Sequence, residues 1–283
     1  MVQGTDISLD HPLLLGILNV TPDSFSDGAQ WLAPGAAVDR ALKMVDQGAD
    51  LIDVGAESTR PGAAAVSADE EWQRLAPVLQ PLAQRGVSLS IDTTKQEVAR
   101  RALDLGAAAI NDVSGLVAAP GIASDCASYG AGLILMHMRG DPRTMQDDVG
   151  YTDIVAEIAS FLGAQADFAV RAGCGVDQIV VDPGVGFGKS AIGSLELLGR
   201  IDELADLGYP VLVGPSRKSF IGQTLGLPVD DRVEATIAAC LVAFAGGATM
   251  FRVHDVEPVR RALDMAEAIR SAAGEGHEER PHG

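Results

Sequence analysis

Eight short apolar runs, separated by alanine-rich amphipathic stretches, follow one another along the 283-residue chain. The runs are continuously apolar rather than alternating, which is typical of parallel strands that are buried on both faces. They occupy residues 14–20, 50–55, 87–92, 108–113, 132–137, 178–182, 210–214 and 248–254. Eight strands that alternate with helices over about 250 residues match the size and element order of a (β/α)8 barrel, the TIM-barrel fold.

The stretches between the runs show helical periodicity, and several of them end at a glycine. We expect helices over residues 35–47, 69–85, 95–105, 122–129, 153–172, 195–207, 233–245 and 256–272. A doubly wound open α/β sheet is the alternative fold, because the sequence does not show on which face of a sheet each helix packs. The number of strands and the positions of the polar residues favour the barrel.

No linker divides the chain, so we predict a single barrel domain over residues 1–273. Residues 1–12 precede the first strand and form a short N-terminal extension, which we expect to be a small hairpin at the bottom of the barrel. Residues 274–283 are polar and low in complexity, and we expect them to be a disordered C-terminal tail.

The net charge of −18 excludes two classes of partner. A chain this acidic repels polyanions at long range, so we expect no nucleic acid and no membrane as partners. The three cysteines, Cys126, Cys174 and Cys240, lie far apart and match no zinc pattern, which indicates free thiols in a reducing compartment. No signal peptide and no membrane-length apolar stretch are evident, and we therefore expect a cytoplasmic protein.

Every apolar run ends in, or leads directly into, polar or ionisable residues. In a (β/α)8 barrel the carboxyl ends of the strands meet at one rim, where active sites are found. One such residue is often only a helix cap, whereas eight at one rim indicate a site. The residues at the eight strand ends are Asn19, Glu57 to Arg60, Asp92, Asn111 with Asp112, His137, Asp182, Ser216 to Lys218, and Arg252 with His254 and Asp255.

Asp92, Asn111 and Asp182 together offer carboxylate acceptors and an amide. Such a set can bind the edge of a planar heterocycle that is rich in N–H groups. Helix capping and hydrogen bonds at the barrel mouth are the alternative roles. Asp112 competes with Asn111 for the binding role, because successive residues of a strand face opposite ways and only one of the two points inward.

A second group of rim residues suits a phosphate or diphosphate. Its positive or proton-donating members are Arg60, Lys218, Arg252 and His254. Thr59 can donate its hydroxyl to the same anion, and Asn19 offers a neutral oxygen to Mg²⁺ that is held mainly by phosphate and water. For Arg60 and Arg217 a surface ion pair is the alternative.

Two segments suggest other chemistry. Residues 182–190 resemble a phosphate-binding P-loop because Gly188, Lys189 and Ser190 follow a strand, but Pro183 occupies the position where that motif needs glycine. Lys218 lies beside Arg217, and a neighbouring cation lowers a lysine pKa, so a Schiff-base lysine is an alternative for Lys218.

Seven segments in this order resemble the dihydropteroate synthase family of folate biosynthesis, from about Leu13 to about Ala272. They are ILNVTPDSFSDG at 17–28, ESTRPG at 57–62, SIDT at 90–93, NDVSG at 111–115, DPG at 182–184, SRKS at 216–219 and RVHD at 252–255. Ala29, Ala56 and Pro215 depart from residues usual in the family, and none of them removes a functional side chain.

The resemblance implies a pterin-binding transferase that joins 6-hydroxymethyl-7,8-dihydropterin diphosphate to p-aminobenzoate and releases diphosphate. It implies Mg²⁺ as cofactor, sulfonamides as competitive inhibitors, and a homodimer. A dissociative mechanism, in which diphosphate leaves before the amine attacks, needs no covalent enzyme intermediate. A methyltetrahydrofolate methyltransferase barrel and an inactive pterin-binding paralogue are the alternatives.

The resemblance also implies a role for each site residue. The pterin ligands are Asp92, Asn111, Asp182, Lys218 and Arg252. The diphosphate ligands are Asn19, Thr59, Arg252 and His254, with Asn19 also binding the metal. The p-aminobenzoate ligands are Phe25, Arg60, Pro61, Phe187, Lys218 and Ser219. The residues assigned to catalysis are Asp92, Asp182, Lys218, Arg252 and His254.

Overall fold

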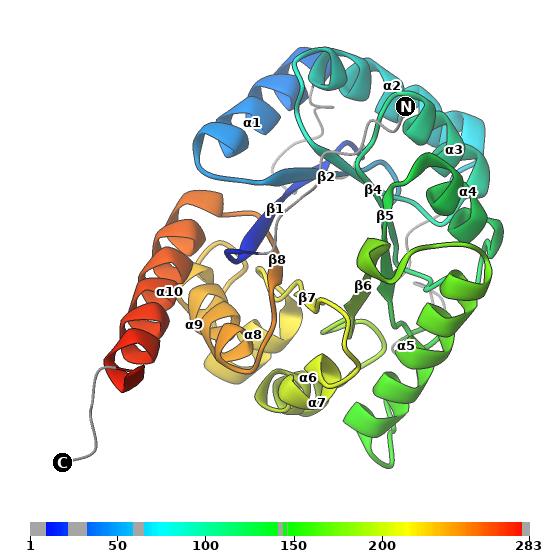
Figure 1. Cartoon of the computed structure of the whole chain (residues 1–283). Helices are drawn as coiled ribbons and strands as arrows, with labels where there is room; N and C mark the ends of the chain where they lie inside the picture. Colours follow the sequence, from blue (N-terminus) through cyan, green and yellow to red (C-terminus); the bar gives the residue numbers. More distant parts are fainter. Residues whose placement is uncertain (1–9, 22–32, 59–64, 141–143, 146, 279–283) are drawn as a thin grey trace.

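Parallel strands form a ring at the centre of the molecule, with helices around the outside (Figure 1). The computed structural model describes residues 10–21, 33–58, 65–140, 144–145 and 147–278. Within these ranges the strands are β1 (Leu13–Asn19), β2 (Leu51–Gly55), β3 (Leu89–Asp92), β4 (Ala109–Asp112), β5 (Gly132–Met136), β6 (Ile179–Asp182), β7 (Leu212–Val213) and β8 (Met250–Val253).

The sheet has the order β6-β5-β4-β3-β2-β1-β8-β7, and all of its paired strands are parallel. Its two outer strands, β6 and β7, meet through one isolated parallel bridge between Val181 and Val211. Val181 also donates its N–H to the Pro210 carbonyl at 3.0 Å. The ring therefore closes, which confirms the predicted (β/α)8 barrel and excludes the open sheet.

The helices follow the predicted pattern, with differences that have local causes. They are α1 (Pro34–Asp46), α2 (Ala68–Gln84), α3 (Gln96–Asp104), α4 (Gly121–Tyr129), α5 (Ile154–Arg171), the 3-10 turn η1 (Val176–Gln178), α6 (Ala191–Gly199), α7 (Asp202–Ala205), α8 (Ser219–Leu225), α9 (Val233–Ala245) and α10 (Val256–Glu278). The short helix α8, which follows Lys218, was not predicted because its seven residues show too little periodicity.

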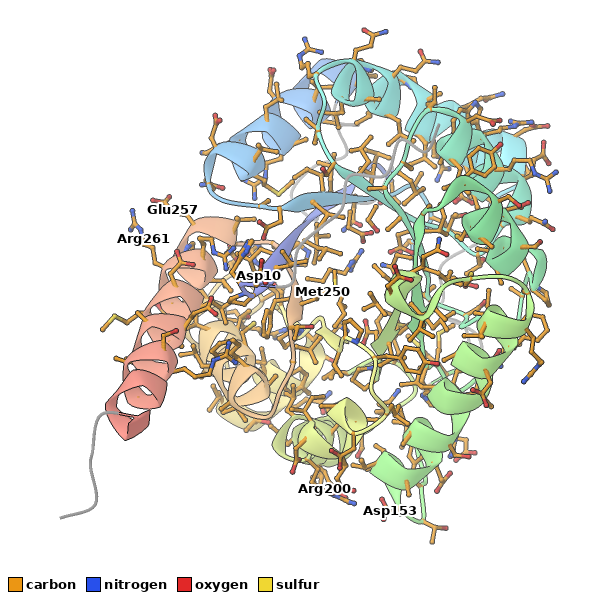
Figure 2. The ribbon with its side chains drawn as sticks, viewed as in Figure 1. Asp10, Asp153, Arg200, Met250, Glu257 and Arg261 are labelled. Carbon is orange, nitrogen blue, oxygen red and sulfur yellow. The ribbon has the colours of Figure 1, made fainter. Side chains whose placement is uncertain are left out.

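The single helix predicted over 195–207 is wrong, since two helices occupy this region. Helix α6 ends at Gly199, and Arg200 leaves the helical conformation with φ −123° and ψ 33°. The Arg200 guanidinium then contacts Glu196 at 2.7 Å, Glu203 at 2.6 Å and Asp153 at 3.3 Å. Figure 2 shows Arg200 and Asp153 side by side on the outer surface, where the ion pair joins the α6–α7 junction to the start of α5.

The C-terminal boundary also differs from the prediction of a disordered segment over 274–283. Helix α10 continues to Glu278, past Gly274 and Gly276. Each interior glycine costs a helix about 1 kcal/mol, but extending a formed helix carries no new nucleation cost. Residues 279–283, and most of the predicted N-terminal hairpin over 1–12, lie outside the described residues.

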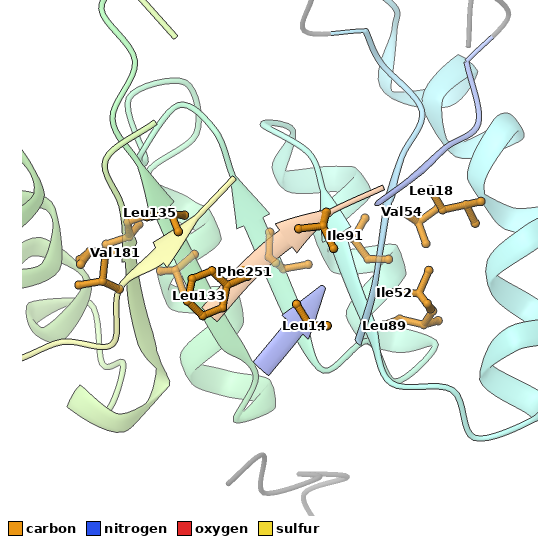
Figure 3. Close-up of a cluster of buried hydrophobic side chains, with 14 of the residues drawn as sticks. Leu14, Leu18, Ile52, Val54, Leu89, Ile91, Leu133, Leu135, Val181 and Phe251 are labelled. Atoms are coloured by element: carbon orange, nitrogen blue, oxygen red, sulfur yellow. The ribbon is translucent and has the colours of Figure 1, made fainter. Parts of the chain in front are cut away.

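The period-two geometry of the strands divides the core into two parts. Outward-facing strand residues pack under the helices in the large cluster that Figure 3 shows in part. Its labelled members are Leu14, Leu18, Ile52, Val54, Leu89, Ile91, Leu133, Leu135, Val181 and Phe251. Inward-facing residues form a second, smaller cluster of Leu13, Leu15, Leu51, Ile134, Leu212 and Met250. Inside the barrel, this apolar layer lies below the polar residues that are nearer the carboxyl ends of the strands.

Cys126, Cys174 and Cys240 are buried free thiols, as predicted. No helix within the described ranges is both long enough and apolar enough to cross a membrane.

Candidate active site

Five of the predicted site residues lie at the carboxyl ends of the strands. Asp92 and Asp182 are the last residues of β3 and β6, Asn111 lies in β4 and Arg252 in β8, and Lys218 is the N-cap residue of α8, just beyond β7. The choice between Asn111 and Asp112 is decided by the strand geometry. Ile110 faces the helices in the outer core cluster, so Asn111 faces the barrel interior and Asp112 faces outward.

Asp112 has a local structural role instead of a binding role. Its Oδ1 accepts hydrogen bonds from the Ser114 N–H at 2.8 Å and from the Ser114 hydroxyl at 2.7 Å. Its Oδ2 accepts the Leu116 N–H at 2.8 Å. The carboxylate is fully buried, and these donors satisfy it within the turn that follows β4.

The centre of the site contains a carboxylate that the sequence analysis missed, Asp53 of β2. Its side chain is fully buried, and its Oδ2 accepts hydrogen bonds from Arg252 Nε at 2.5 Å and from Asn111 Nδ2 at 3.2 Å. The other end of the Arg252 guanidinium binds Asp92 Oδ2 at 2.9 Å. Asp53 therefore joins two predicted pterin ligands, Asn111 and Arg252, through one carboxylate oxygen.

Asp53 was missed because it lies inside an apolar run rather than at its end. The usable signal was periodicity: Asp53 is two residues before Gly55, the end of β2, and therefore shares the inward face with it. A charged residue on the inward face of a buried parallel strand needs a partner, and that requirement points to a site.

Several buried polar atoms at this level of the barrel have no hydrogen-bond partner among the described residues. They include Asp53 Oδ1, Asn111 Oδ1 and Ser90 Oγ. Asp53 and Ser90 are register partners on β2 and β3, so two of the three come from neighbouring strands at the same height. Buried polar groups are usually paired, and unpaired acceptors that face a barrel interior suit a ligand with N–H groups.

Three titratable residues of the site, Asp92, Asp182 and Lys218, have pKa values shifted toward neutrality. Burial raises the pKa of Asp92 to about 7, with Arg252 opposing the shift and Asp53 adding to it. Burial also raises the pKa of Asp182, which Lys218 opposes. Burial lowers the pKa of Lys218 to about 8, and Asp182 opposes this. Such clustered shifts are typical of functional sites.

Lys218 and Asp182 both form hydrogen bonds with the backbone of the loop after β6. Lys218 Nζ donates to the Val185 carbonyl at 2.5 Å and lies 4.4 Å from the centre of the Phe187 ring. Asp182 Oδ1 accepts the Gly184 N–H at 2.7 Å. Lys218 is therefore a hydrogen-bond donor and a positive charge at this rim of the barrel, and the Phe187 ring lies beside it.

His254 is the proton donor expected next to an anion, and the structure indicates which form it takes. Burial, with Arg252 and Arg217 nearby, lowers its pKa to about 3, so the ring is neutral at physiological pH. Ser216 Oγ accepts the His254 backbone N–H at 3.1 Å and lies 3.0 Å from Nδ1. The Ser216 hydroxyl can then donate to Nδ1, which leaves the proton on Nε2 as a donor.

The other predicted residues fall into two groups. Asn19 is exposed at the end of β1, and Ser219 is exposed at the start of α8. Phe25, Thr59, Arg60 and Pro61 lie outside the described residues. Arg217 takes its alternative role, because its guanidinium forms an ion pair with Asp255 at 2.6 Å. His137 follows the last residue of β5, and its ring contacts Lys189.

Comparison with known proteins agrees with this geometry. The family model for pterin-binding enzymes matches residues 15–254. The chain belongs to the dihydropteroate synthase family of pterin-binding enzymes. A dihydropteroate synthase of Synechocystis is 48% identical over 258 residues, covering 90% of this chain and 89% of the relative. The family resemblance noted in the sequence is confirmed, and the chain is a transferase.

Solved structures of this family superpose on the whole barrel. The Yersinia pestis dihydropteroate synthase, solved with a sulfonamide drug, has a TM-score of 0.90 at 42% identity and covers 96% of this chain and 98% of its own. The Xanthomonas albilineans enzyme, solved with 4-aminobenzoic acid, has a TM-score of 0.86 at 43% identity, with coverage of 93% and 95%.

Proposed function

We propose that this chain condenses 6-hydroxymethyl-7,8-dihydropterin diphosphate with p-aminobenzoate to give 7,8-dihydropteroate and diphosphate. The observation that carries the proposal is a set of acceptors next to Arg252 inside the barrel, namely the buried Asp53, Asn111 and Asp182 and the half-buried Asp92. This arrangement suits a flat heterocycle that presents several N–H groups. The family's enzymes carry the same activity in their names.

In this proposal Asp92, Asn111, Asp182 and Lys218 bind the edge of the pterin, and Arg252 packs over its face. Asp53 positions Arg252 and Asn111 through its Oδ2. Its unpaired Oδ1 is available as a further acceptor. The interior of the barrel is low in dielectric, so each of these hydrogen bonds discriminates strongly against ligands that lack the matching donor.

Arg252, His254, Thr59 and Asn19 bind the diphosphate in the same proposal. The neutral His254 ring offers its Nε2–H as a hydrogen-bond donor, and the Ser216 hydroxyl on Nδ1 maintains that tautomer. The amide oxygen of Asn19, exposed at the end of β1, is the kind of hard neutral ligand that Mg²⁺ accepts. When bound, Mg²⁺ neutralises charge on the leaving diphosphate.

The residues of the site support a dissociative reaction. The bond between the pterin methylene carbon and the diphosphate oxygen breaks first, and the electron pair leaves with diphosphate. Asp92 and Asp182 stabilise the resulting pterin cation electrostatically, and Arg252 and His254 bind the leaving anion. The amine nitrogen of p-aminobenzoate then attacks the methylene carbon and releases a proton. Lys218 acts as a hydrogen-bond donor and as a positive charge, and the mechanism needs no Schiff base.

We place p-aminobenzoate near the mouth, against Phe187, Lys218 and Ser219, with Phe25, Arg60 and Pro61 as further contacts. The half-buried Phe187 ring beside Lys218 supports this, because it offers an aromatic face next to a cation for a benzoate. Sulfonamides, which resemble p-aminobenzoate in shape, should compete for the same position. The enzyme of Yersinia pestis was solved with such a drug.

The direct test is to incubate the purified protein with the pterin diphosphate, p-aminobenzoate and Mg²⁺, and to assay dihydropteroate. We expect turnover that a sulfonamide inhibits competitively with p-aminobenzoate. Tight pterin binding without product would overturn the synthase proposal and indicate an inactive paralogue. Inhibition that is independent of the p-aminobenzoate concentration would show that the sulfonamide does not bind at the p-aminobenzoate site.

Pterin binding should have a bell-shaped pH dependence. Asp92, with a pKa of about 7, accepts N–H groups as a carboxylate only above that pH, so affinity falls as the pH drops below it. Lys218, with a pKa of about 8, loses its charge above that pH, so affinity falls again there. Titrating 6-hydroxymethyl-7,8-dihydropterin, which has no phosphate of its own, by calorimetry between about pH 6 and pH 9 checks both limbs.

The Asp92→Asn variant is the control for the acid limb. Its amide does not titrate, so its weaker affinity should rise less steeply through about pH 7 than that of the wild type. An unchanged acid limb in this variant would assign the titration to another group.

A cytoplasmic location and a homodimer complete the proposal. Exposed apolar side chains on α6, α9 and α10 support self-association, namely Ile192, Leu195, Val242, Met265 and Ile269. Helices α6 and α9 are neighbours, as are α9 and α10, so these side chains belong to adjacent elements. Light scattering of the purified protein checks the dimer, and a monomer at micromolar concentration would exclude it.

A further inference from the structure

Lys189 is almost completely buried and has no role in the proposed condensation reaction. Its side chain is 3% exposed, and its Nζ lies within hydrogen-bond distance of three acceptors. They are the Phe187 carbonyl at 2.7 Å, His137 Nδ1 at 3.0 Å and the His137 carbonyl at 3.2 Å. One side chain thus joins the end of β5 to the loop 184–188 that follows β6.

The His137 ring is held in a form that can accept this bond. It packs edge-on against Phe161 of α5, with the ring centres 5.0 Å apart and the planes at 85°. Burial, with Lys189 and Arg139 nearby, lowers the pKa of His137 to about 3, so the ring is neutral at physiological pH. A neutral ring that accepts at Nδ1 carries its proton on Nε2.

A second side chain holds the neighbouring residue of the same loop. The Tyr151 hydroxyl donates to the Gly188 carbonyl at 2.9 Å, and the Arg139 guanidinium lies 3.7 Å from the centre of the Tyr151 ring. Together with the bond from Lys218 to the Val185 carbonyl, side chains from three segments bind three carbonyls of the loop.

Two glycines let this loop lie directly on the end of β5. Gly184 has φ +64°, and a Cβ there would lie 2.1 Å from the His137 carbonyl oxygen. Gly188 has φ +61°, and a Cβ there would lie 3.0 Å from Arg139. A side chain at Gly184 would clash with the His137 carbonyl, and glycine adopts the positive φ at both positions without strain. The loop backbone is thus fixed on one side by packing and on the other by hydrogen bonds.

Phe187 is the residue that this arrangement places. Its carbonyl is bound by Lys189, its N–H donates to the Gly184 carbonyl at 2.9 Å, and its ring lies beside Lys218. We propose that Lys189, with His137 and Tyr151, is a positioning residue that fixes the Phe187 ring and thereby the p-aminobenzoate site. The proposal rests on the proposed function, since it assumes that the amine substrate lies against Phe187.

The test is a comparison of Lys189→Met with the wild type. Methionine has a similar length and suits a buried position, but it cannot donate to the three acceptors. Losing a buried donor of this kind typically costs about tenfold or more in an equilibrium. We expect the KM for p-aminobenzoate to rise about tenfold, while the Kd for the pterin substrate changes less than about twofold and kcat falls only slightly.

Two further variants make the result interpretable. Tyr151→Phe removes only the bond to Gly188, so it should raise the same KM by a smaller factor, about threefold. Lys43→Met, on the exposed face of α1, is the matched control for loss of a lysine and should leave both constants unchanged. If Lys189→Met does not fold, the same division between KM and pterin Kd in Tyr151→Phe supports the proposal.

An unchanged KM for p-aminobenzoate in a folded Lys189→Met protein would overturn the proposal. An equal loss of affinity for both substrates would also overturn it, because Lys189 would then only stabilise the barrel. An unchanged KM in Tyr151→Phe, where Lys189→Met does not fold, has the same meaning. Absence of dihydropteroate formation by the wild type in parallel assays would refute the proposed function instead, so the two failures are distinguishable.

Discussion

Replacing Lys218 with methionine is expected to weaken pterin binding by about 100-fold. The variant loses a charge-assisted donor, worth about 1.5–3 kcal/mol at a buried site. It also leaves Asp182 without the cation that opposes the burial-driven rise of its pKa. Asp182 then becomes protonated at higher pH and loses its ability to accept N–H groups. Calorimetric titration of the pterin substrate into both proteins measures the effect.

The Lys43→Met variant again serves as the control, since it removes an exposed lysine from α1. Circular dichroism shows whether the Lys218→Met barrel is intact. Lys218 also donates to the Val185 carbonyl, and a modest loss of stability is expected with the loss of affinity. A folded Lys218→Met protein with unchanged pterin affinity would remove Lys218 from the pterin site.

Replacing Asp53 with alanine is expected to destabilise the fold by about 3 kcal/mol. Breaking a buried ion pair by removing one partner typically costs about 3–5 kcal/mol, because the remaining charge stays buried. Arg252 keeps its second partner, Asp92, so we expect the lower end of that range. The Asn111 amide also loses its acceptor. Urea denaturation gives the change in the free energy of unfolding.

Two further variants separate stability from binding. Asp264→Ala removes the exposed partner of Arg260 within one turn of α10, a type of pair that contributes about 0.5 kcal/mol or less. Asp53→Asn keeps the shape and one acceptor oxygen, so it should destabilise less than Asp53→Ala while still weakening pterin binding. An Asp53→Ala protein as stable as Asp264→Ala would show that Asp53 does not stabilise Arg252.

The strand pattern could be predicted because burial on both faces leaves a strong signal in each run. Continuous apolar segments located the strands, and the polar residues that follow them located the rim. Helix α8 and the α6–α7 break left no such signal. Short helices have almost no periodicity. At the break, Arg200 pairs with Glu196 and Glu203 nearby and with Asp153, which lies 47 residues away in the sequence.

The inner part of the site could not be predicted from the polar residues at the strand ends alone. Asn111 and Asp112 are both polar and adjacent, and only the register of β4 against its neighbours decides which one faces inward. Asp53 lies two residues before the end of β2, inside an apolar run, so the polar residues at the strand ends do not point to it. His137 and Lys189 looked like rim and phosphate-loop residues, yet their side chains contact each other because the loop after β6 folds back onto β5.

The single Val181–Val211 bridge has a consequence for motion in the free enzyme. Every other junction between strands of the ring has two or more registered pairs, and β7 itself has only two residues. Local opening is therefore easiest between β6 and β7. Asp182 and Lys218 lie on the two sides of this junction. A pterin that binds both side chains connects the two edges, so substrate should slow amide exchange there more than elsewhere in the barrel.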